Sequence, residues 1–452
     1  MTQLGEAIAR YHKLIESAPF KDLSWATALH EQMAAAHLTE GGRPISPFLR
    51  PHFVTRRRYN TLVKAAEALF SAIDRVKQLA LSNPALLARM ELLPAEKMLA
   101  SIDPGYPYLA VTSLLDAHLD NGFLRFVDYN ADTATSVAFG AALADLFYEC
   151  PPVKQFRRHY KLSKLGGTRH LVSAVLTAQK AFGGRKAPRI GVLEFRQPFQ
   201  AAEPSEYALL CEMFRRHGCQ AEIVSPDLLE YRNGELRQGD FVIDLVFRRV
   251  KVQEFLLRYD LSHPLVRAYG DRRVCVINSF RSELAHKKAI FALLTDDSLT
   301  ASFPAAERNA IAEHIPWTRV VAPVRTNYGN KKIDLPEFIL KNREKLVLKP
   351  NDDSGEEHCY QGWLMDDAGW ERALKAAARS TYVVQEKAES ARAVFPLLRY
   401  GQLEMKELQV DVHPHAYLGK VEGCSSWLSD VNAGGFSSIA GLTPTYILET
   451  KP

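Results

Sequence analysis

Paired cysteines are absent from this 452-residue sequence. Its six cysteines are scattered, and no two of them form a Cys-x-x-Cys pair. This spacing is typical neither of a zinc knuckle nor of a disulfide framework, so it favours a protein of the reducing cytoplasm. The cysteines are Cys150, Cys211, Cys219, Cys275, Cys359 and Cys424.

Long apolar stretches are missing as well. No run of about 20 apolar residues occurs, and the first residues, MTQLGEAIARYHKL, contain no apolar signal core. We therefore expect a soluble, cytoplasmic protein that has no membrane partner. The basic runs, such as Arg56, Arg57 and Arg58, are short and lack interleaved aromatic residues, which argues against nucleic-acid binding.

Several catalytic motifs are absent too. The sequence has no Gly-x-Ser-x-Gly elbow, no His-Glu-x-x-His pair and no Gly-x-x-x-x-Gly-Lys-Ser/Thr loop, and its fourteen histidines show no ligand spacing. Nothing in the sequence therefore supports a serine hydrolase, a metalloprotease or a P-loop enzyme.

The composition is that of an ordinary globular protein, with 47% hydrophobic and 24% charged residues. A chain of this length is too long for one core, so two or three domains are expected. The net charge of +5 weakly favours an anionic ligand.

Hydrophobic periodicity divides the chain into four regions. Residues 1–103 have the three- and four-residue spacing of helices. Residues 104–186 contain a predicted hairpin followed by two helices. Residues 187–280 show a βαβ pattern, which implies a parallel sheet, and residues 281–452 alternate helices with strands. The predicted fold class is α/β or α+β with a helical N-terminal extension.

The predicted hairpin carries the first polar cluster. Asp116 precedes the tight-turn signal at Asn121 and Gly122, and Asp128 and Asn130 follow it. Asp128 and Asn130 are two residues apart, so they share one face of a strand and can converge with Asp116. Oxygen ligands of this kind suit Mg²⁺. The alternative is that they merely start a turn and cap the next helix.

Two further clusters follow apolar strands. Lys349 ends the strand in EKLVLKPNDD and leads into a polar loop, an arrangement that can hold polyphosphate. Gln385, Glu386 and Lys387 end the strand in TYVVQEK, where side-chain and backbone groups could meet an adenine edge. An exposed hairpin and a strand leaving the core are the respective alternatives.

A fourth cluster is basic. Arg281, His286, Lys287 and Lys288 stand at the start of an amphipathic helix. Cations there oppose the helix dipole, so a bound anion would explain them. A solvated surface is the alternative.

Together these clusters resemble a known family. FVDYNADTATS resembles the Glu-Tyr-Asn-Ala-Asp-Thr-Pro-Thr-Ser segment of glutathionylspermidine synthase-like enzymes, which are ATP-grasp ligases with a circularly permuted chain. NSFRSELAHKKAIFALL, LVLKPNDD and YVVQEK resemble the later motifs of that family, in the same order. The resemblance covers most of the chain after about residue 50. It implies an ATP-grasp fold in circularly permuted order, with residues 187–280 as a pre-ATP-grasp-like domain.

The resemblance also implies an activity. The family members are ATP- and Mg²⁺-dependent ligases that join a carboxylic acid to an amine through an acyl phosphate. Asp116, Asp128 and Asn130 match the magnesium ligands of the family, and Lys288 and Lys349 match its nucleotide-phosphate lysines. We expect all five side chains to lie in one cleft.

The same resemblance places the adenine hinge at Gln385 and Glu386, with Lys387 beside it. The substrates are not encoded in any motif, and we expect a small-molecule or peptide acid and an amine. Arg281 is the candidate catalytic residue that would hold the carboxylate of the acid, and Arg248 and Arg249 are further candidates for that role. Ordinary surface arginines are the alternative. Self-association into a homodimer is left open.

The sequence departs from the family at several positions. Asp128 replaces a glutamate, and Leu114 and Trp427 stand near positions where the family has phosphate-binding arginines. Glu356 and Glu357 replace glycines of the loop that covers the phosphates. Each of these last four changes weakens anion binding. A degenerate ATP-grasp protein that serves as a binding or scaffold partner is therefore the alternative function.

Overall fold

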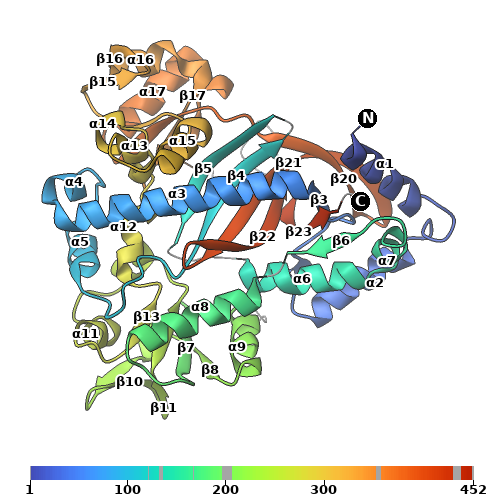
Figure 1. The fold of residues 1–452 in the computed structure, drawn as a ribbon, viewed down its shortest axis with the longest axis horizontal. Coiled ribbons are helices and arrows are strands. Elements are labelled where there is room, and N and C mark those ends of the chain that lie inside the picture. Colours follow the sequence, from blue (N-terminus) through green and yellow to red (C-terminus); the bar gives the residue numbers. More distant parts are fainter. Residues whose placement is uncertain are drawn as a thin grey trace.

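The computed structural model describes residues 2–120, 122–131, 136–165, 167–195, 206–352, 358–430 and 439–449. Asn121 of the expected turn, and Glu356 and Glu357, lie outside these residues. The described chain has three main parts, each built on its own sheet. In Figure 1 a large central sheet lies between a parallel sheet at the bottom and a small sheet at the top left.

The central sheet joins strands from both ends of the chain. Its order is β3-β23-β22-β21-β4-β5, with β20 paired to β21 and β6 paired to β23. Neighbouring strands are antiparallel, except that β23 runs parallel to β3. The strands are β3 (His52–Thr55), β4 (Thr112–Asp120), β5 (Phe123–Asn130), β6 (Leu162–Lys164), β20 (Ala391–Arg399), β21 (Gln402–Tyr417), β22 (Lys420–Ser429) and β23 (Ala440–Leu448).

One long helix, α3 (Arg56–Ser82), crosses one face of this sheet (Figure 1). It begins directly after β3, where the Thr55 hydroxyl accepts a hydrogen bond from the Arg58 amide. Its apolar stripe, which includes Leu69 and Ile73, packs against buried residues of β21 and β22. Full burial of one such side chain contributes about 1.5–3 kcal/mol. On the opposite face, β4 and β5 carry the polar side chains Asp116 and Asp128.

Helix α6 (Val137–Glu149) covers the part of this opposite face that is formed by β22 and β23. Helices α1 (Gln3–Ile15), α2 (Ser24–Ala35) and α7 (Pro151–Phe156) complete this second core. The region expected to be helical therefore also contributes β3 to the central sheet and closes one side of the molecule.

The predicted βαβ unit is confirmed. Its sheet has the order β13-β12-β7-β8, and all of its strands are parallel. The packed helices are α8 (Thr168–Ala181) and α9 (Glu206–Arg216). The strands are β7 (Arg189–Leu193), β8 (Gln220–Val224), β12 (Leu245–Arg248) and β13 (Cys275–Ile277).

The small sheet is antiparallel, with the order β14-β19-β17-β18. Helices α16 (Leu335–Lys341) and α17 (Asp367–Ala377) pack on it around the buried Trp370. The strands are β14 (Thr318–Val320), β17 (Leu346–Pro350), β18 (Tyr360–Gln361) and β19 (Tyr382–Glu386).

Short elements connect these parts. The helices are α4 (Pro84–Ala88), α5 (Pro94–Ser101), α10 (Val252–Leu256), α11 (Pro264–Gly270), α12 (Glu283–His286), α13 (Ala289–Leu294), α14 (Asp297–Thr300) and α15 (Ala305–His314). The short strands are β1 (Thr39–Glu40), β2 (Arg43–Pro44), β9 (Glu230–Arg232), β10 (Glu235–Gln238), β11 (Phe241–Ile243), β15 (Arg325–Tyr328) and β16 (Lys331–Asp334). Among the described residues, no helix has both the length and the apolar character needed to cross a membrane.

Candidate functional site

The pairing of β4 with β5 brings the acids of the predicted hairpin together. Asp116 lies directly opposite Asp128, and Asn130 lies opposite Leu114. Both acids remain partly exposed, with 36% of the Asp116 side chain and 27% of the Asp128 side chain open to solvent. The two carboxylates therefore sit side by side on the face of the sheet that α3 does not cover.

Strand β21 adds a histidine to this row. Nε2 of His413 lies 3.4 Å from Oδ1 of Asp116. The next strand, β22, continues the row with Ser425, which is opposite His413. His413 was not among the residues expected from the sequence.

A lysine from another part of the chain reaches the second acid. Nζ of Lys288 lies 3.2 Å from Oδ2 of Asp128, and only 9% of the lysine side chain is exposed. Lys288 stands between α12 and α13, which connect the βαβ unit to the small sheet. The backbone amide of Lys288 donates to the carbonyl of Asn351, just after β17.

Lys349 approaches the same place from the small sheet. Its Nζ donates to Oε1 of Gln385 at 2.8 Å and to the backbone oxygen of Val127 at 3.3 Å. Gln385 in turn donates to the hydroxyl of Thr318. The two lysines are 61 residues apart in the chain, yet both lie beside strand β5.

The two remaining hinge residues have partners within the small sheet and its surroundings. The hydroxyl of Tyr328 donates to Oε1 of Glu386 at 2.5 Å, and the amide of Trp317 donates to Oε2 at 3.3 Å. Nζ of Lys387 lies 4.6 Å from the centre of the Trp363 ring. Gln385 therefore faces Lys349, whereas the Glu386 carboxylate is held by Tyr328 and Trp317.

The electrostatic environment shifts the pKa values of the two acids in opposite directions. Burial raises the pKa of the Asp116 carboxyl above its ordinary value; His413 opposes this shift and the nearby Asp128 carboxylate adds to it. Burial would also raise the pKa of Asp128, but Lys288 and Lys349 outweigh it, so the pKa of Asp128 is lowered. Asp128 is thus the carboxylate whose charged form is stabilised by the protein itself.

The donors in this row fit a hard divalent cation. Asp116 and Asp128 offer carboxylate oxygens, and Asn130 lies on the adjacent position of the same face. Oxygen ligands and room for water are what Mg²⁺ requires. Two lysines beside the acids supply the positive charge that a polyphosphate would need.

Arg281 lies elsewhere. Its Nε donates to the backbone oxygen of Ala100, and its side chain lines a 430 Å³ groove together with Arg272 and Tyr106. The structure records no contact of Arg281 with Asp116, Asp128 or the two lysines among the described residues.

Two other arginines that could hold a carboxylate are already engaged by the protein. Arg248 donates to the backbone oxygens of Asn278 and Val250 and to the hydroxyl of Ser282. Arg249 forms a buried ion pair with Glu206 at 2.7 Å. Both therefore have structural partners.

The departures from the family pattern include two residues that the structure describes. Leu114 is 5% exposed and faces His415 of β21 and Asn130 of β5. Trp427 is half-buried and packs against the core beneath α6. Neither side chain offers a charge to an anion.

The residues missed from the sequence lie on β21. In LQVDVHPHAY, Gln409, Asp411, His413 and His415 alternate with apolar residues, and this two-residue period could have marked a polar face. Nδ1 of His118 on β4 lies 2.8 Å from Oδ1 of Asp411, directly beside the row of Asp116 and His413. Only knowledge that β21 pairs with β4 connects these residues to the site.

Comparisons with known proteins concern the fold. No protein-family model matches the sequence, and no curated protein matches it either. Among solved structures, a glutathione synthetase-like effector from Globodera pallida, in its apo form, matches with a TM-score of 0.62 and 14% identity, over 96% of this chain and 98% of that chain.

Two further matches to solved structures are weak, with TM-scores below 0.5. One is to a protein from Methylobacillus flagellatus that is described as a γ-glutamylcysteine synthetase, with a TM-score of 0.43, 10% identity and 85% coverage of each chain. The other is to the ATP-grasp ligase PsnB in complex with a minimal precursor, with a TM-score of 0.27, 12% identity and coverage of 58% of this chain and 89% of that chain. The chain shares a mixed α/β fold with the glutathione synthetase-like effector, and the α/β class expected from the sequence is confirmed.

Proposed function

We propose that this protein is an ATP- and Mg²⁺-dependent ligase that joins a carboxylic acid to an amine. The observation that carries the proposal is the meeting of Asp116 and Asp128 with Lys288 and Lys349, which come from three separate segments of the chain. Paired acids beside two lysines are suited to a metal–polyphosphate complex, and phosphoryl transfer is catalysed mainly by positioning and by neutralising charge.

In this proposal Asp116, Asp128 and Asn130 hold Mg²⁺, which would neutralise charge on the phosphates when bound. Lys288 and Lys349 contact the phosphate oxygens, and Gln385, Glu386 and Lys387 border the adenine. The hydrogen bond from Lys349 to Gln385 would orient the lysine between adenine and phosphates.

The proposed reaction has two steps. A carboxylate oxygen of the acid substrate attacks the γ-phosphorus, the bond to the β-phosphate oxygen breaks, and an acyl phosphate and ADP result. The amine nitrogen then attacks the acyl carbon, phosphate leaves, and the nitrogen loses its proton. Arg281 is the proposed anchor of the acid substrate. It lines an open groove together with Arg272, so the acid would have to reach from this groove to the γ-phosphate.

A second candidate function is a degenerate ATP-grasp protein that binds a partner without turnover. The buried Leu114 and the packed Trp427 favour it, because both stand where the resemblance expects arginines. The test is ATP consumption by the purified protein with mixtures of small acids, peptides and amines. Equal amounts of ADP, phosphate and amide support the ligase, whereas Mg²⁺-dependent ATP binding without turnover in any mixture favours the second candidate.

A further inference from the structure

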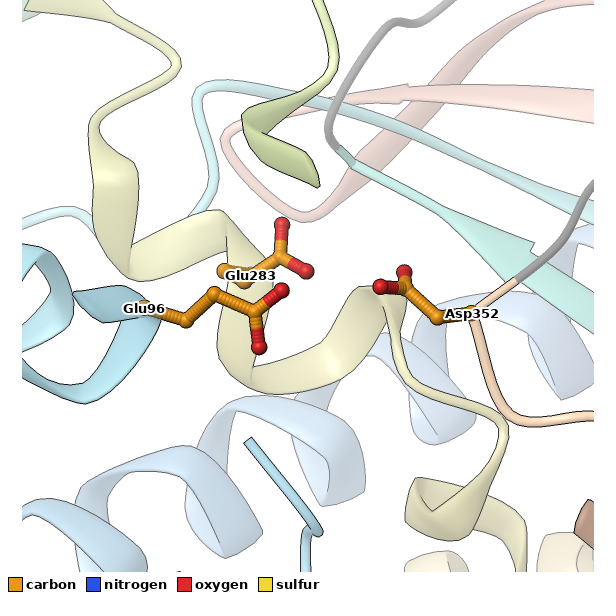
Figure 2. A group of neighbouring side chains, drawn as sticks. All are labelled: Glu96, Glu283 and Asp352. Carbon is orange, nitrogen blue, oxygen red and sulfur yellow. The ribbon is translucent and has the colours of Figure 1, made fainter. Parts of the chain in front are cut away.

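Two buried carboxylates and a partly exposed one meet outside the row of Asp116 and Asp128. Figure 2 shows Glu96, Glu283 and Asp352 pointing toward one another, and one oxygen from each carboxylate lies within 4.8 Å of the other two. The three side chains come from different elements. Glu96 belongs to α5, Glu283 to α12, and Asp352 follows β17 of the small sheet.

Lys287 supplies the positive charge for these acids. Its Nζ lies 2.8 Å from Oε1 of Glu96 and 3.0 Å from Oε1 of Glu283, and it also contacts Oδ2 of Asp352. Only 2% of the lysine side chain is exposed, and both glutamates are fully buried. Burial alone would lower the pKa of Lys287, but the surrounding carboxylates outweigh it and raise that pKa. The ammonium thus fills the centre that a metal ion would otherwise need.

The buried ion cluster, formed by Lys287, Glu96, Glu283 and Asp352, adjoins both lysines of the candidate site. Lys287 precedes Lys288 in the chain, and Asp352 follows Lys349 by three residues. Between the two segments, the Lys288 amide donates to Asn351 O at 2.9 Å, and the Ala289 amide donates to Asn351 Oδ1 at 2.8 Å. The cluster and these two bonds hold one end of β17 against the segment that carries Lys288.

We propose that Lys287 is a positioning residue that, through the buried ion cluster, fixes the small sheet to the rest of the protein so that Lys288 and Lys349 face the same acids. The role in nucleotide binding rests on the proposed function, whereas the mechanical role does not. Removal of one partner from a buried ion cluster leaves charges uncompensated, so the contacts around it must rearrange.

The mechanical role is tested by hydrogen exchange without any ligand. In Lys287→Met, the Lys288 and Ala289 amides should exchange about tenfold faster or more, since local opening governs their protection. Lys287→Arg keeps the cation and should restore most of the protection. Asp352→Asn removes a single carboxylate, and it should accelerate both amides by a smaller factor.

The matched control is Asp244→Asn. Asp244 is an equally exposed carboxylate, at 16%, that pairs with Arg189 in the parallel sheet. This variant should leave the exchange of the Lys288 and Ala289 amides unchanged. If Lys287→Met does not fold, the test is the difference in exchange of the Lys288 and Ala289 amides between Asp352→Asn and Asp244→Asn. Unchanged exchange at both amides in every folded cluster variant would overturn the proposal.

Nucleotide binding then tests the functional consequence. Affinity for Mg·ATP should fall in Lys287→Met and Asp352→Asn, while affinity for adenosine, which would need only the hinge, should stay near that of the wild type. An equal loss for both ligands would contradict a positioning role and indicate general destabilisation. Absence of ATP binding in the wild-type protein would instead refute the proposed function, and the exchange experiment would still decide the role of Lys287.

Discussion

Lys288→Met should strengthen metal binding in the absence of nucleotide while weakening the binding of ATP. The Lys288 ammonium lies 3.2 Å from Oδ2 of Asp128, so it neutralises one of the proposed metal ligands. At that separation two opposite unit charges attract by about 5 kcal/mol at an effective dielectric constant near 20 and by about 1 kcal/mol in water. A cation that binds Asp128 must overcome this attraction or displace the lysine.

Methionine has a similar length and no charge, so the substitution removes the competing cation and keeps the packing. If about 1.4 kcal/mol of the attraction is released, affinity for Mn²⁺ alone should rise about tenfold. Affinity for Mg·ATP should fall, because the proposed phosphate contact of Lys288 is lost. Both quantities can be measured by titration, with free Mn²⁺ followed by electron paramagnetic resonance.

Lys406→Met is the matched control. This lysine pairs with Asp430. It lies on β21, seven residues before His413, and an odd separation along a strand places the two side chains on opposite faces of the central sheet. It should change neither affinity. Unchanged or weaker Mn²⁺ binding in Lys288→Met, with the fold intact, would refute the reasoning that Lys288 competes with the metal.

Three further predictions address the site, stability and the loop. Asp128→Asn should keep the fold, since the side chain is partly exposed, and should remove most of the Mg²⁺-dependent ATP affinity; unchanged affinity across a Mg²⁺ titration would contradict its assignment. Burial lowers the pKa of His415 to about 3, so this histidine stays neutral in the folded state and its contribution to stability is lost as pH falls below the ordinary value of about 6.5. In His415→Gln, the free energy of unfolding from urea titrations should therefore depend less on pH, by about 1.4 kcal/mol per pH unit between about pH 4 and 6, and an unchanged slope would contradict the shift. Replacement of both Glu356 and Glu357 by glycine should tighten ATP binding about tenfold if about 1.4 kcal/mol of charge repulsion is relieved, and equal or weaker binding would mean that the acids do not face the phosphates.

Local patterns in the sequence were sufficient to predict the two strands that carry Asp116 and Asp128. The tight-turn signal at Asn121 and Gly122, between the strand-like segments 108–119 and 122–130, predicted two paired strands. The spacing of Asp128 and Asn130 predicted that they share a face. The βαβ pattern was equally direct, because buried parallel strands are short apolar runs separated by a helix. These features depend on neighbours in the chain, so one sequence can reveal them.

Contacts between distant segments were harder to predict. His413 joins the row of acids only because β21 pairs with β4, and these strands are almost 300 residues apart. The basic turn was expected to face a bound anion or solvent. Lys287, however, is buried among three carboxylates of the protein itself, which come from segments near residues 96, 283 and 352. No short-range sequence pattern predicts such a cluster.

Arg248 and Arg249 illustrate the same limit. Two adjacent arginines at the end of a strand are suited to hold a substrate carboxylate, yet their partners are backbone oxygens, Ser282 and the buried Glu206. The circularly permuted order stays a prediction. The same holds for the roles of all the assigned site residues, which are Asp116, Asp128, Asn130, Arg281, Lys288, Lys349, Gln385, Glu386 and Lys387.

The most direct test of the central claim is the affinity of the unmodified protein for ATP, measured by calorimetry with and without Mg²⁺. The meeting of Asp116 and Asp128 with Lys288 and Lys349 predicts that ATP binds and that Mg²⁺ strengthens the binding at least about tenfold, because the metal would bridge acids and phosphates. No binding, or equal binding in the absence of Mg²⁺, would contradict the account.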